Sequence, residues 1–499
     1  MASSILRRIT FHPGFWLGIG LFFLILLVPV NEAFTLPERN MLAITALMAV
    51  WWMSEALPLA VTSLLPLVLY PVMGIMKTSE VSPNFSHHLI FLFLGGFMIA
   101  IALQEWQLHR RFAIYIIALL GSNPRRLVLA FMLSTALLSM WISNTATTIM
   151  MLPIALAVIH QIQGKENPEE MARNVFGSVL MLGIAYSAGI GGIATLIGTP
   201  PNVVFSGIYG KFFPQLPEIS FVRWMTLALP LAIILFFLIW GYLVYGVLRK
   251  KHLPEIQNKA FFDEQKRQML PLNNAQKWVL VIFFITAFLW IFRADIKVGF
   301  ATIPGWPHFI GLGHRIQDST IAIGMAIFLF IIPTRVEGKN QTLLQWKNLL
   351  EIPWDILLLF GGGFALADGI QKTGLAEFIG KHLVFLGHMP FWLMLFLLSI
   401  SVAILTEFTS NTAVATTVLP ILAALSMDLH MDPLIIMFPA TVAASCAFML
   451  PVSTPPNAIV FGSRYIPIQR MVRIGVILIV LASLIVSTYF FIIFKFIGV

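Results

Sequence analysis

The sequence contains little charge and almost no cysteine. Only 11% of its 499 residues are Asp, Glu, Lys or Arg, whereas 59% are hydrophobic. A soluble domain usually carries about 25% charged residues. This composition excludes a secreted, cytosolic or nucleic-acid-binding globular protein, because such a chain could not cover its surface in water. The single cysteine, Cys446, lies in an apolar stretch, so an intramolecular disulfide and a cysteine-based metal site are both excluded.

Catalytic signatures are also missing. The sequence has no HExxH zinc motif, no Walker A loop and no GxSxG nucleophile elbow. The glycine run 361–363 lies in an apolar segment without Lys, which favours helix packing over phosphate binding. His87 and His88 precede an apolar span and are better explained as interfacial residues than as metal ligands. The sequence therefore predicts neither an enzyme nor a cofactor.

Apolar runs long enough to cross a membrane recur along the whole chain. Spans are expected near 14–30, 39–76 (two spans), 89–121, 222–248, 278–293, 318–333, 354–370 and 471–497. Four further runs carry almost no charge: 127–159, 174–210, 389–427 and 433–463. We expect an all-α polytopic protein of the lipid bilayer. The short loops favour a bacterial inner membrane.

Basic residues predict the orientation of the chain. Arg7–Arg8, Arg125–Arg126, the 249–277 segment and the 334–350 loop hold many of them, and positive residues concentrate in cytoplasmic loops. We therefore assign the formal net charge of +9 to these loops and not to a nucleic-acid partner. The N-terminus is expected in the cytoplasm and the C-terminus outside. No small-residue cleavage site follows the first apolar run, which predicts an uncleaved helix.

The uncharged run 127–159 has an informative length. Its 33 residues would form a helix of about 50 Å, against a hydrocarbon core of about 30 Å, and two full spans would need about 40 residues. A re-entrant hairpin fits this length, provided that its turn is buried in protein or lines a water-filled cavity. We expect one hairpin over 127–160, with its turn near Ser143 and Asn144, and a second over 389–427.

The two halves of the chain share an internal repeat. The sequence SNTA at 143–146 returns at 410–413, 267 positions later, and GGF at 95–97 returns at 362–364 with the same offset. TPPN at 199–202 returns as 454–457, 255 positions later. One polar triplet would be a weak signal, but matched motifs in one order indicate inverted repeats, which are typical of secondary transporters. The expected organisation is an N-terminal helix (1–38), a first repeat (39–248), a cytoplasmic linker (249–277) and a second repeat (278–499).

The repeated residues can bind ions without carrying charge. Hairpin turns and broken helices expose backbone groups: half-helix N-termini favour anions, and unwound carbonyls bind cations. The paired prolines predict broken helices over 174–210 and 433–463. Small polar residues also mediate ordinary helix packing. An amide in mid-membrane is costly without a partner, however, and Asn144 and Asn411 occupy equivalent places.

Glu407 is the only charged residue in the run 389–427. An intramembrane carboxylate can bind a cation or transfer a proton. Its equivalent in the first repeat is Met140, so the repeat does not support a role shared by both halves. This favours a structural carboxylate that is hydrogen bonded to Asn or to the backbone.

With its paired SNT motifs, each followed by TPPN, and with WWMSEALP at 51–58, the chain resembles the divalent anion/sodium symporter family. This family includes bacterial dicarboxylate transporters of the INDY type and animal sodium–carboxylate and sodium–sulfate cotransporters. The resemblance covers nearly the whole chain. It implies about 11 transmembrane helices with two re-entrant hairpins and two broken helices. It also implies a homodimer in which a transport domain moves across the membrane as an elevator.

The resemblance also implies site residues. One sodium ion would be bound by Ser139, Ser143, Asn144 and the backbone near Gly198, and a second by Thr406, Ser410, Asn411 and the backbone near Ser453. The anion would contact Asn144, Thr145, Asn411 and Thr412, with Thr199, Thr454 and Pro455 nearby. No Lys or Arg is close in sequence to either SNT motif, so bound sodium ions and helix dipoles would balance the charge of a dianion.

Several alternatives stay open at this level. A channel would need a charge-lined pore, and an intramembrane enzyme would need a nucleophile or metal ligands; neither pattern is present. A transporter of the arsenite or citrate type is a closer rival, but SNT in both halves favours the divalent-anion family. Within it, sodium-independent exchange of di- or tricarboxylates and transport of sulfate remain alternatives. The absence of basic residues beside SNT and the hydroxyls of Ser139 and Thr406 favour sodium symport. The short loops favour a C4-dicarboxylate such as succinate.

Overall fold

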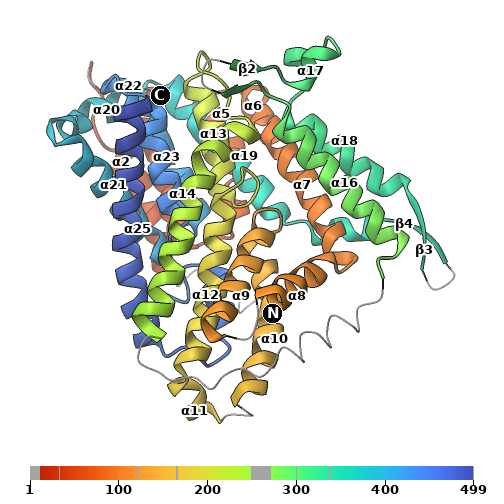
Figure 1. Ribbon diagram of the computed structural model, residues 1–499. Helices are drawn as coiled ribbons and strands as arrows, with labels where there is room; N and C mark the ends of the chain where they lie inside the picture. The colour runs from red at the N-terminus through yellow and green to blue at the C-terminus, as the bar shows by residue number, and fades with distance from the viewer. Residues whose placement is uncertain are drawn as a thin grey trace, which may run out of the picture.

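The computed structural model describes residues 12–32, 34–120, 123–163, 167–248, 271–298, 301–336 and 339–497 (Figure 1). Arg7–Arg8 and most of the expected linker 249–277 lie outside these residues. The predicted helical character is confirmed: eight helices of the described chain are long and apolar enough to cross a membrane. Shorter apolar helices, such as Pro13–Leu26 and Pro433–Ala444, accompany them.

The first half contains fifteen described elements. They are α2 (Pro13–Leu26), α3 (Leu36–Ser54), α4 (Leu59–Thr62), α5 (Leu65–Val72), α6 (Thr78–Val81), η1 (Ser82–Ser86), α7 (His88–Glu105), α8 (Leu108–Leu120), α9 (Pro124–Ser139), α10 (Asn144–Gln163), α11 (Pro168–Arg173), α12 (Val175–Ile193), α13 (Pro200–Phe212), α14 (Phe221–Gly241) and the π-helical η2 (Tyr242–Val247).

The second half has helices of matching order and adds short strands. It comprises α16 (Asn274–Ile291), β1 (Ile296–Val298), β2 (Ala301–Ile303), α17 (Trp306–Phe309), η4 (Gly313–Arg315), α18 (Asp318–Ile331), β3 (Pro333–Val336), β4 (Lys339–Thr342), η5 (Trp346–Glu351), α19 (Trp354–Lys372), α20 (Leu375–Leu383), η6 (Val384–His388), α21 (Phe391–Phe408), α22 (Asn411–Asp428), α23 (Pro433–Ala444), α24 (Pro455–Phe461) and α25 (Ile468–Ile497).

Two helical hairpins and two interrupted helices stand where the long uncharged runs lie. The run 127–160 holds α9 and α10, which pack against each other and are joined by residues 140–143; α21 and α22 occupy the run 389–427. In 174–210 the helix stops after α12 and resumes as α13, and in 433–463 it stops after α23 and resumes as α24. Each resuming helix begins with a proline, which needs no N–H partner in the first turn.

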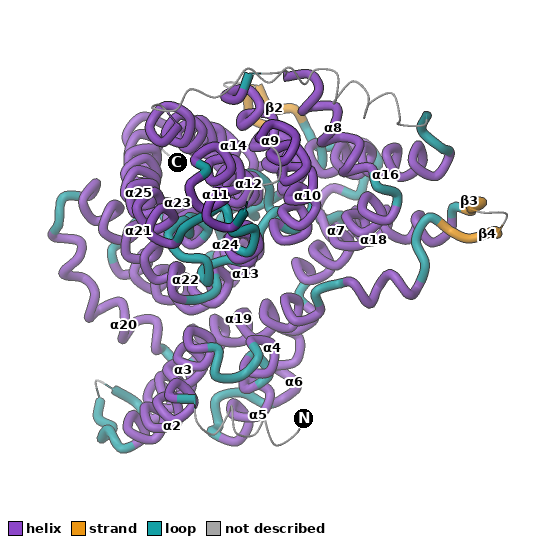
Figure 2. The backbone as a smooth tube through the Cα atoms, turned by 90° about the horizontal axis from the view of Figure 1, so that it is seen from below, coloured by secondary structure: helices purple, strands orange, loops and turns teal. Residues whose placement is uncertain are grey.

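The two halves interlock around these elements. Helix α10 of the first hairpin packs against α24, and α22 of the second hairpin packs against α13. Each hairpin therefore contacts the interrupted helix of the other half. Viewed from below, α12, α13 and α21–α25 form one group, while α2–α6 and α19 lie together on another side (Figure 2). The contacts between α10 and α24 and between α22 and α13 bring together the four elements that carry the repeated motifs.

The repeated glycine pairs bring helices close together. A Cβ on Gly95 of α7 would lie 2.6 Å from the carbonyl carbon of Ala322 in α18. A Cβ on Gly362, its equivalent in α19, would lie 2.5 Å from the Cβ of Ser63, just after α4. Small residues of this kind allow membrane helices to approach each other closely. The GGF repeat therefore serves packing in both halves.

Two features differ from the sequence-based expectation. The run 89–121 is divided into α7 and α8 at Gln107, whose φ of 52° interrupts the helix. The chain is also not purely helical, because β1 pairs with β2 and β3 pairs with β4 in antiparallel two-stranded sheets. These strands lie in polar connections that contain β-branched residues such as Val298 and Thr302, which favour extended backbone.

Candidate functional site

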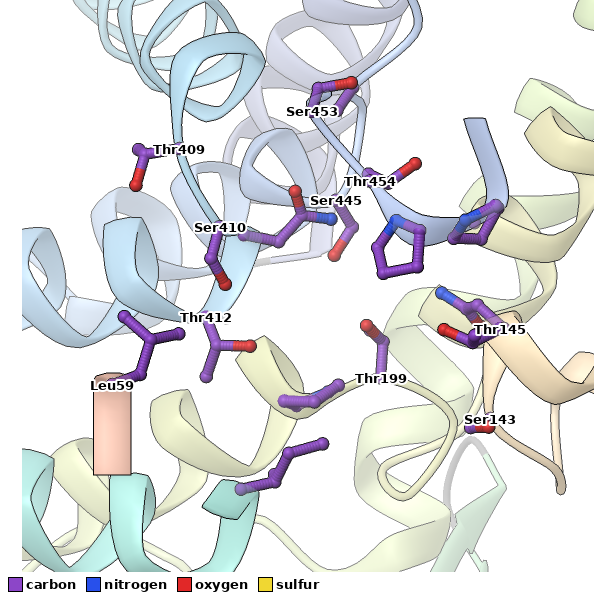
Figure 3. A pocket seen from close by; sticks show the side chains of 18 of the residues that line it. Leu59, Ser143, Thr145, Thr199, Thr409, Ser410, Thr412, Ser445, Ser453 and Thr454 are labelled. Carbon is purple, nitrogen blue, oxygen red and sulfur yellow. The ribbon is translucent and has the colours of Figure 1, made fainter. Parts of the chain in front are cut away.

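A cavity of about 690 Å³ lies where the two hairpins and the two interrupted helices meet. All seven residues expected to contact the anion line it: Asn144, Thr145, Thr199, Asn411, Thr412, Thr454 and Pro455. Figure 3 shows Ser143 and Thr145 on one side of this cavity and Ser410 and Thr412 on the other, with Thr199 and Thr454 between them. Ser143 and Thr454, which are 311 positions apart in the sequence, thus line one site.

The residues expected at the sodium sites divide into two positions. Ser143, Asn144, Gly198, Ser410, Asn411 and Ser453 line the cavity. The other two, Ser139 and Thr406, are fully buried at the ends of α9 and α21, behind the hairpin turns. The structure therefore brings the expected ligands of each half together, but only part of each set faces the open space.

The two turn asparagines are held in the same way. Ser139 Oγ donates to Asn144 Oδ1 at 2.5 Å, and Thr406 Oγ1 donates to Asn411 Oδ1 at 2.6 Å. Each bond uses the amide oxygen, so the amide N–H groups stay free for another partner. The hydroxyls at 139 and 406 thus fix the orientation of the two amides that face the cavity.

Two further asparagines hold the breaks open, a role that sequence reasoning missed. Asn202 Nδ2 donates to the carbonyls of Gly192 and Thr195, at 3.0 and 2.7 Å. Asn457 Nδ2 donates to the equivalent carbonyls of Ala447 and Leu450, at 3.2 and 3.1 Å. The signal was present as the last letter of both TPPN motifs. The equivalent donors and acceptors show that the same offset of 255 positions relates the two breaks.

Two glycines allow close approaches at the first break, one within the break and one to Asn144. A Cβ on Gly198 would lie 2.5 Å from the carbonyl oxygen of Gly192, and a Cβ on Gly192 would lie 2.7 Å from Asn144 Oδ1. Both distances are too short for a real Cβ, so a larger residue at 192 would push the break away from the hairpin, and one at 198 would push apart the two ends of the break. Backbone of the break and the amide oxygen thereby come within one small region, which suits cation binding.

Glu407 stabilises the second break. Its Oε1 accepts from the backbone N–H groups of Phe448 and Met449 at 2.6 and 2.8 Å, and its Oε2 accepts from Leu450 N–H at 2.9 Å. Unwound backbone in a buried place needs such partners. The structure thus shows the backbone-bonded carboxylate that the sequence favoured. At the equivalent place, the backbone carbonyl of Met140 accepts from Thr195 Oγ1 at 2.5 Å.

The electrostatics of the cavity come from backbone more than from side chains. Four helices begin at its wall, α10, α13, α22 and α24. The first two positions of α13 and α24 are prolines, which have no N–H, so only α10 and α22 carry backbone N–H groups at these positions. Helix N-termini carry partial positive charge and favour anions. The described residues that line the cavity include no Lys, Arg or His; the charged ones are Glu55 and Asp355, which are both exposed.

The histidine pair lies outside this site. His87 caps α7, and its Nδ1 accepts from Leu89 N–H at 3.4 Å, while its ring lies 4.5 Å from that of His88 and 4.8 Å from that of Phe364. Within the described parts of the chain, no group of three or more His, Cys, Asp or Glu residues could hold a metal ion. A site for small hard cations would have to be built from neutral oxygens.

Comparison with known proteins extends these observations. The family described as "Sodium:sulfate symporter transmembrane region" matches residues 14–497. The chain is 41% identical over 468 residues to the sodium-dependent dicarboxylate transporter SdcS of Staphylococcus saprophyticus, covering 93% of this chain and 87% of the relative. The SdcS protein of Staphylococcus aureus (strain NCTC 8325) matches with 41% identity over 467 residues, with the same coverage of both chains.

Solved structures show a related fold at low sequence identity. MtrF of Neisseria gonorrhoeae, described with a class of antimetabolite efflux pumps, aligns with a TM-score of 0.55 and 11% identity over 83% of each chain. The YdaH transporter of Alcanivorax borkumensis aligns with a TM-score of 0.55 and 14% identity, over 82% of this chain and 86% of its own. The match over residues 14–497 and the two SdcS relatives confirm the resemblance that the motifs indicated: the chain belongs to the sodium:sulfate symporter family.

Proposed function

We propose that this protein is a secondary active transporter that couples sodium entry to the uptake of a C4-dicarboxylate such as succinate. One observation carries the proposal. Two equivalent hydroxyl–amide pairs, Ser139 with Asn144 and Thr406 with Asn411, lie in two hairpins that meet at one cavity. The described residues that line this cavity include no basic side chain. The relatives named sodium-dependent dicarboxylate transporters support the same substrate class.

The charge of the site supports coupling to a cation. A dicarboxylate carries two negative charges, whereas α10 and α22, the two helices with N–H groups at their first positions, together supply roughly one positive charge. Fixed cations are missing from the described lining, and Glu55 and Asp355 add negative charge near the mouth. Bound sodium ions supply the balance. Sodium therefore binds first and completes the anion site, so that anion affinity depends on sodium concentration.

The ligand sets of the two sodium ions are related by the internal repeat. The first sodium ion is bound by oxygens of Ser139, Ser143 and Asn144 with backbone carbonyls near Gly198, and the second by the equivalent set at Thr406, Ser410, Asn411 and the backbone near Ser453. Neutral hydroxyl, amide and carbonyl oxygens suit a hard monovalent cation. The carboxylates of the anion are bound by Asn144 and Thr145 at one end and Asn411 and Thr412 at the other. Thr199, Thr454 and Pro455 close the remaining wall.

The overall mechanism is alternating access by an elevator movement in a homodimer with about eleven spans, two of them interrupted. The chain crosses the plasma membrane with its N-terminus in the cytoplasm and its C-terminus outside. An asymmetry between the hairpin turns supports two alternating states. Trp141 packs against Phe283 and Phe221, with ring centroids 4.9 and 5.9 Å apart, whereas its repeat equivalent Phe408 is 66% exposed. Alternation would exchange these two environments.

Uptake by purified protein in proteoliposomes tests the proposal. Radiolabelled succinate should accumulate when sodium is present outside, and replacing sodium with choline should abolish accumulation. A competition panel of malate, fumarate, 2-oxoglutarate, citrate, tartrate and sulfate then defines the substrate class. Undiminished uptake in choline would refute sodium coupling and indicate an exchanger. Competition by sulfate but by no dicarboxylate would refute the assigned anion.

A further inference from the structure

Helices α13 and α19 cross where the two groups of helices meet. The view from below shows α13 in the group with α12 and α21–α25, and α19 in the group with α2–α6 (Figure 2); the two helices pack against each other. A Cβ on Gly207 of α13 would overlap the ring of Phe364 in α19, so glycine permits this close crossing. One turn further along both helices, Lys211 Nζ lies 3.9 Å from Asp368 Oδ2.

Asn84 joins this ion pair from η1, which packs against α6 and α19. Lys211 Nζ donates to Asn84 Oδ1, and Asn84 Nδ2 donates to Asp368 Oδ2 at 3.2 Å. The same amide donates to the carbonyl of Val81 at 3.0 Å, which fixes its position beside α6. Asn84 is buried, and the side chains of Lys211 and Asp368 are only 17% and 20% exposed. Three polar side chains thus connect the two groups of helices in a place with little access to water.

The equivalent crossing of the repeat is open. The offset of 255 pairs Gly207 with Gly462, at the end of α24, and the offset of 267 pairs Phe364 with Phe97 of α7. Among the described residues, and its chain neighbours aside, a Cβ on Gly462 would meet only carbonyl oxygens of its own helix. Phe364 is fully buried, whereas Phe97 is half-buried and lines the cavity. In the proposed alternation, the crossing of α7 and α24 closes when that of α13 and α19 opens.

The charged pair is not repeated. The same offsets pair Lys211 with Ile466 and Asp368 with Ile101. Two isoleucines form no ion pair when their helices meet. Separating Lys211 from Asp368, in contrast, removes a charge-assisted contact from a mostly buried place, which is costly. The ion pair therefore favours the closed crossing of α13 and α19 over the opposite arrangement.

We infer that Lys211 and Asp368 are positioning residues of the transport cycle, whose ion pair, joined by Asn84, holds the group that contains α13 against α19 in the state of this structure. This inference rests on the proposed function. Neither charged residue is among the described residues that line the cavity. The pair therefore acts on the balance between the two states and not by contact with the substrate. Each transport cycle has to break it and form it again.

Cysteine labelling of the two hairpin turns reports this balance. The reporters are Phe408→Cys and Trp141→Cys, each in a Cys446→Ala background. Position 408 is exposed in this structure and position 141 is packed against aromatic rings, and the proposed alternation exchanges the two environments. The ratio of the two labelling rates by a maleimide, measured on purified protein, therefore follows the ratio of the two states.

Four substitutions are combined with each reporter. Lys211→Met and Asp368→Asn remove one charge each, whereas Lys211→Arg keeps the charge. Lys372→Met is the matched control, because its ion pair with Glu80, at 3.7 Å, joins α19 to α6 within one group of helices.

Loss of either charge should raise labelling at the first hairpin turn roughly 10-fold relative to labelling at the second. This is the lower end of the worth of a hydrogen bond to a charged group, since both side chains are partly exposed. Combining Lys211→Met with Asp368→Asn should add little, because both remove the same contact. Lys211→Arg and Lys372→Met should keep the wild-type ratio.

Three results would overturn the inference. An unchanged labelling ratio in both charge-removing variants, even with a lower melting temperature, would assign the pair to local structure alone. An equal shift in Lys372→Met would attribute the effect to any charge on α19. Additive shifts in the double variant would show that the two charges act separately. Failure of the proposed function is recognised separately, because wild-type protein would then take up no dicarboxylate, whereas the labelling needs no substrate.

Discussion

Glu407 should stabilise the second break and should not transfer protons. Replacing it with Ala removes the acceptor of three backbone N–H groups, those of Phe448, Met449 and Leu450. An unsatisfied buried donor costs about 1–3 kcal/mol. Phe448 is buried, but Met449 and Leu450 are half-buried, so water can reach part of this segment. The lower end of the range then gives about 3 kcal/mol for the three donors.

This free energy corresponds to a measurable change in the apparent Kd for the substrate. If the break must keep its open form to bind substrate, a loss of about 3 kcal/mol lowers the binding-competent population roughly 100-fold and raises the apparent Kd by the same factor. Glu407→Gln keeps one carbonyl oxygen for Phe448 and Met449 and loses one charge-assisted bond, worth about 1.5 kcal/mol or roughly 10-fold. Met140→Leu, at the equivalent place, is the control and should have little effect, because Met140 contributes only its carbonyl to the hydrogen bond.

Succinate binding and thermal unfolding of the purified variants test this ranking. Affinity should fall in the order wild type, Glu407→Gln, Glu407→Ala, and the melting temperature should fall in the same order. A Glu407→Gln variant with wild-type stability and wild-type binding but no transport would refute the structural account. That result would assign a proton-carrying or cation-coupling role to the carboxylate.

Two further predictions follow from the geometry of the site. Asn457→Ala removes the amide that donates to the carbonyls of Ala447 and Leu450, so succinate uptake should drop at least 10-fold. Asn457→Asp keeps an acceptor but loses these donors, so it should not restore uptake. Uptake by the Ala variant at the wild-type rate would show that the break does not need these hydrogen bonds. In a variant with Cys446 replaced by Ala, Phe408→Cys should react rapidly with a membrane-impermeant maleimide added from the exposed side, and Trp141→Cys should react slowly; equal rates would contradict the asymmetry between the hairpin turns.

The sequence predicts the main elements of the site because they follow from local rules. Run length and the absence of charge locate both hairpins, and the prolines locate both breaks. The repeat then places Asn144 and Asn411 at equivalent turns, and the structure shows that each accepts a hydrogen bond from the hydroxyl five positions earlier. These relations are short in sequence, so one sequence is enough to find them.

What the sequence could not predict depends on contacts between distant segments. The partners of Glu407 lie 41 to 43 positions away, and the carbonyls bound by Asn202 become available only once the helix has stopped. The division of α7 from α8 rests on the single left-handed residue Gln107, whose type gives no warning of it.

Succinate binding by purified wild-type protein, Asn144→Ala and Asn411→Ala, measured at several sodium concentrations, tests whether both hairpins and sodium build one anion site. Wild-type protein should bind succinate only when sodium is present, and each variant should lose binding although the two residues lie in different halves of the chain. Sodium-independent binding by the wild type, or wild-type affinity in either variant, would contradict a single anion site built by both hairpins and completed by sodium.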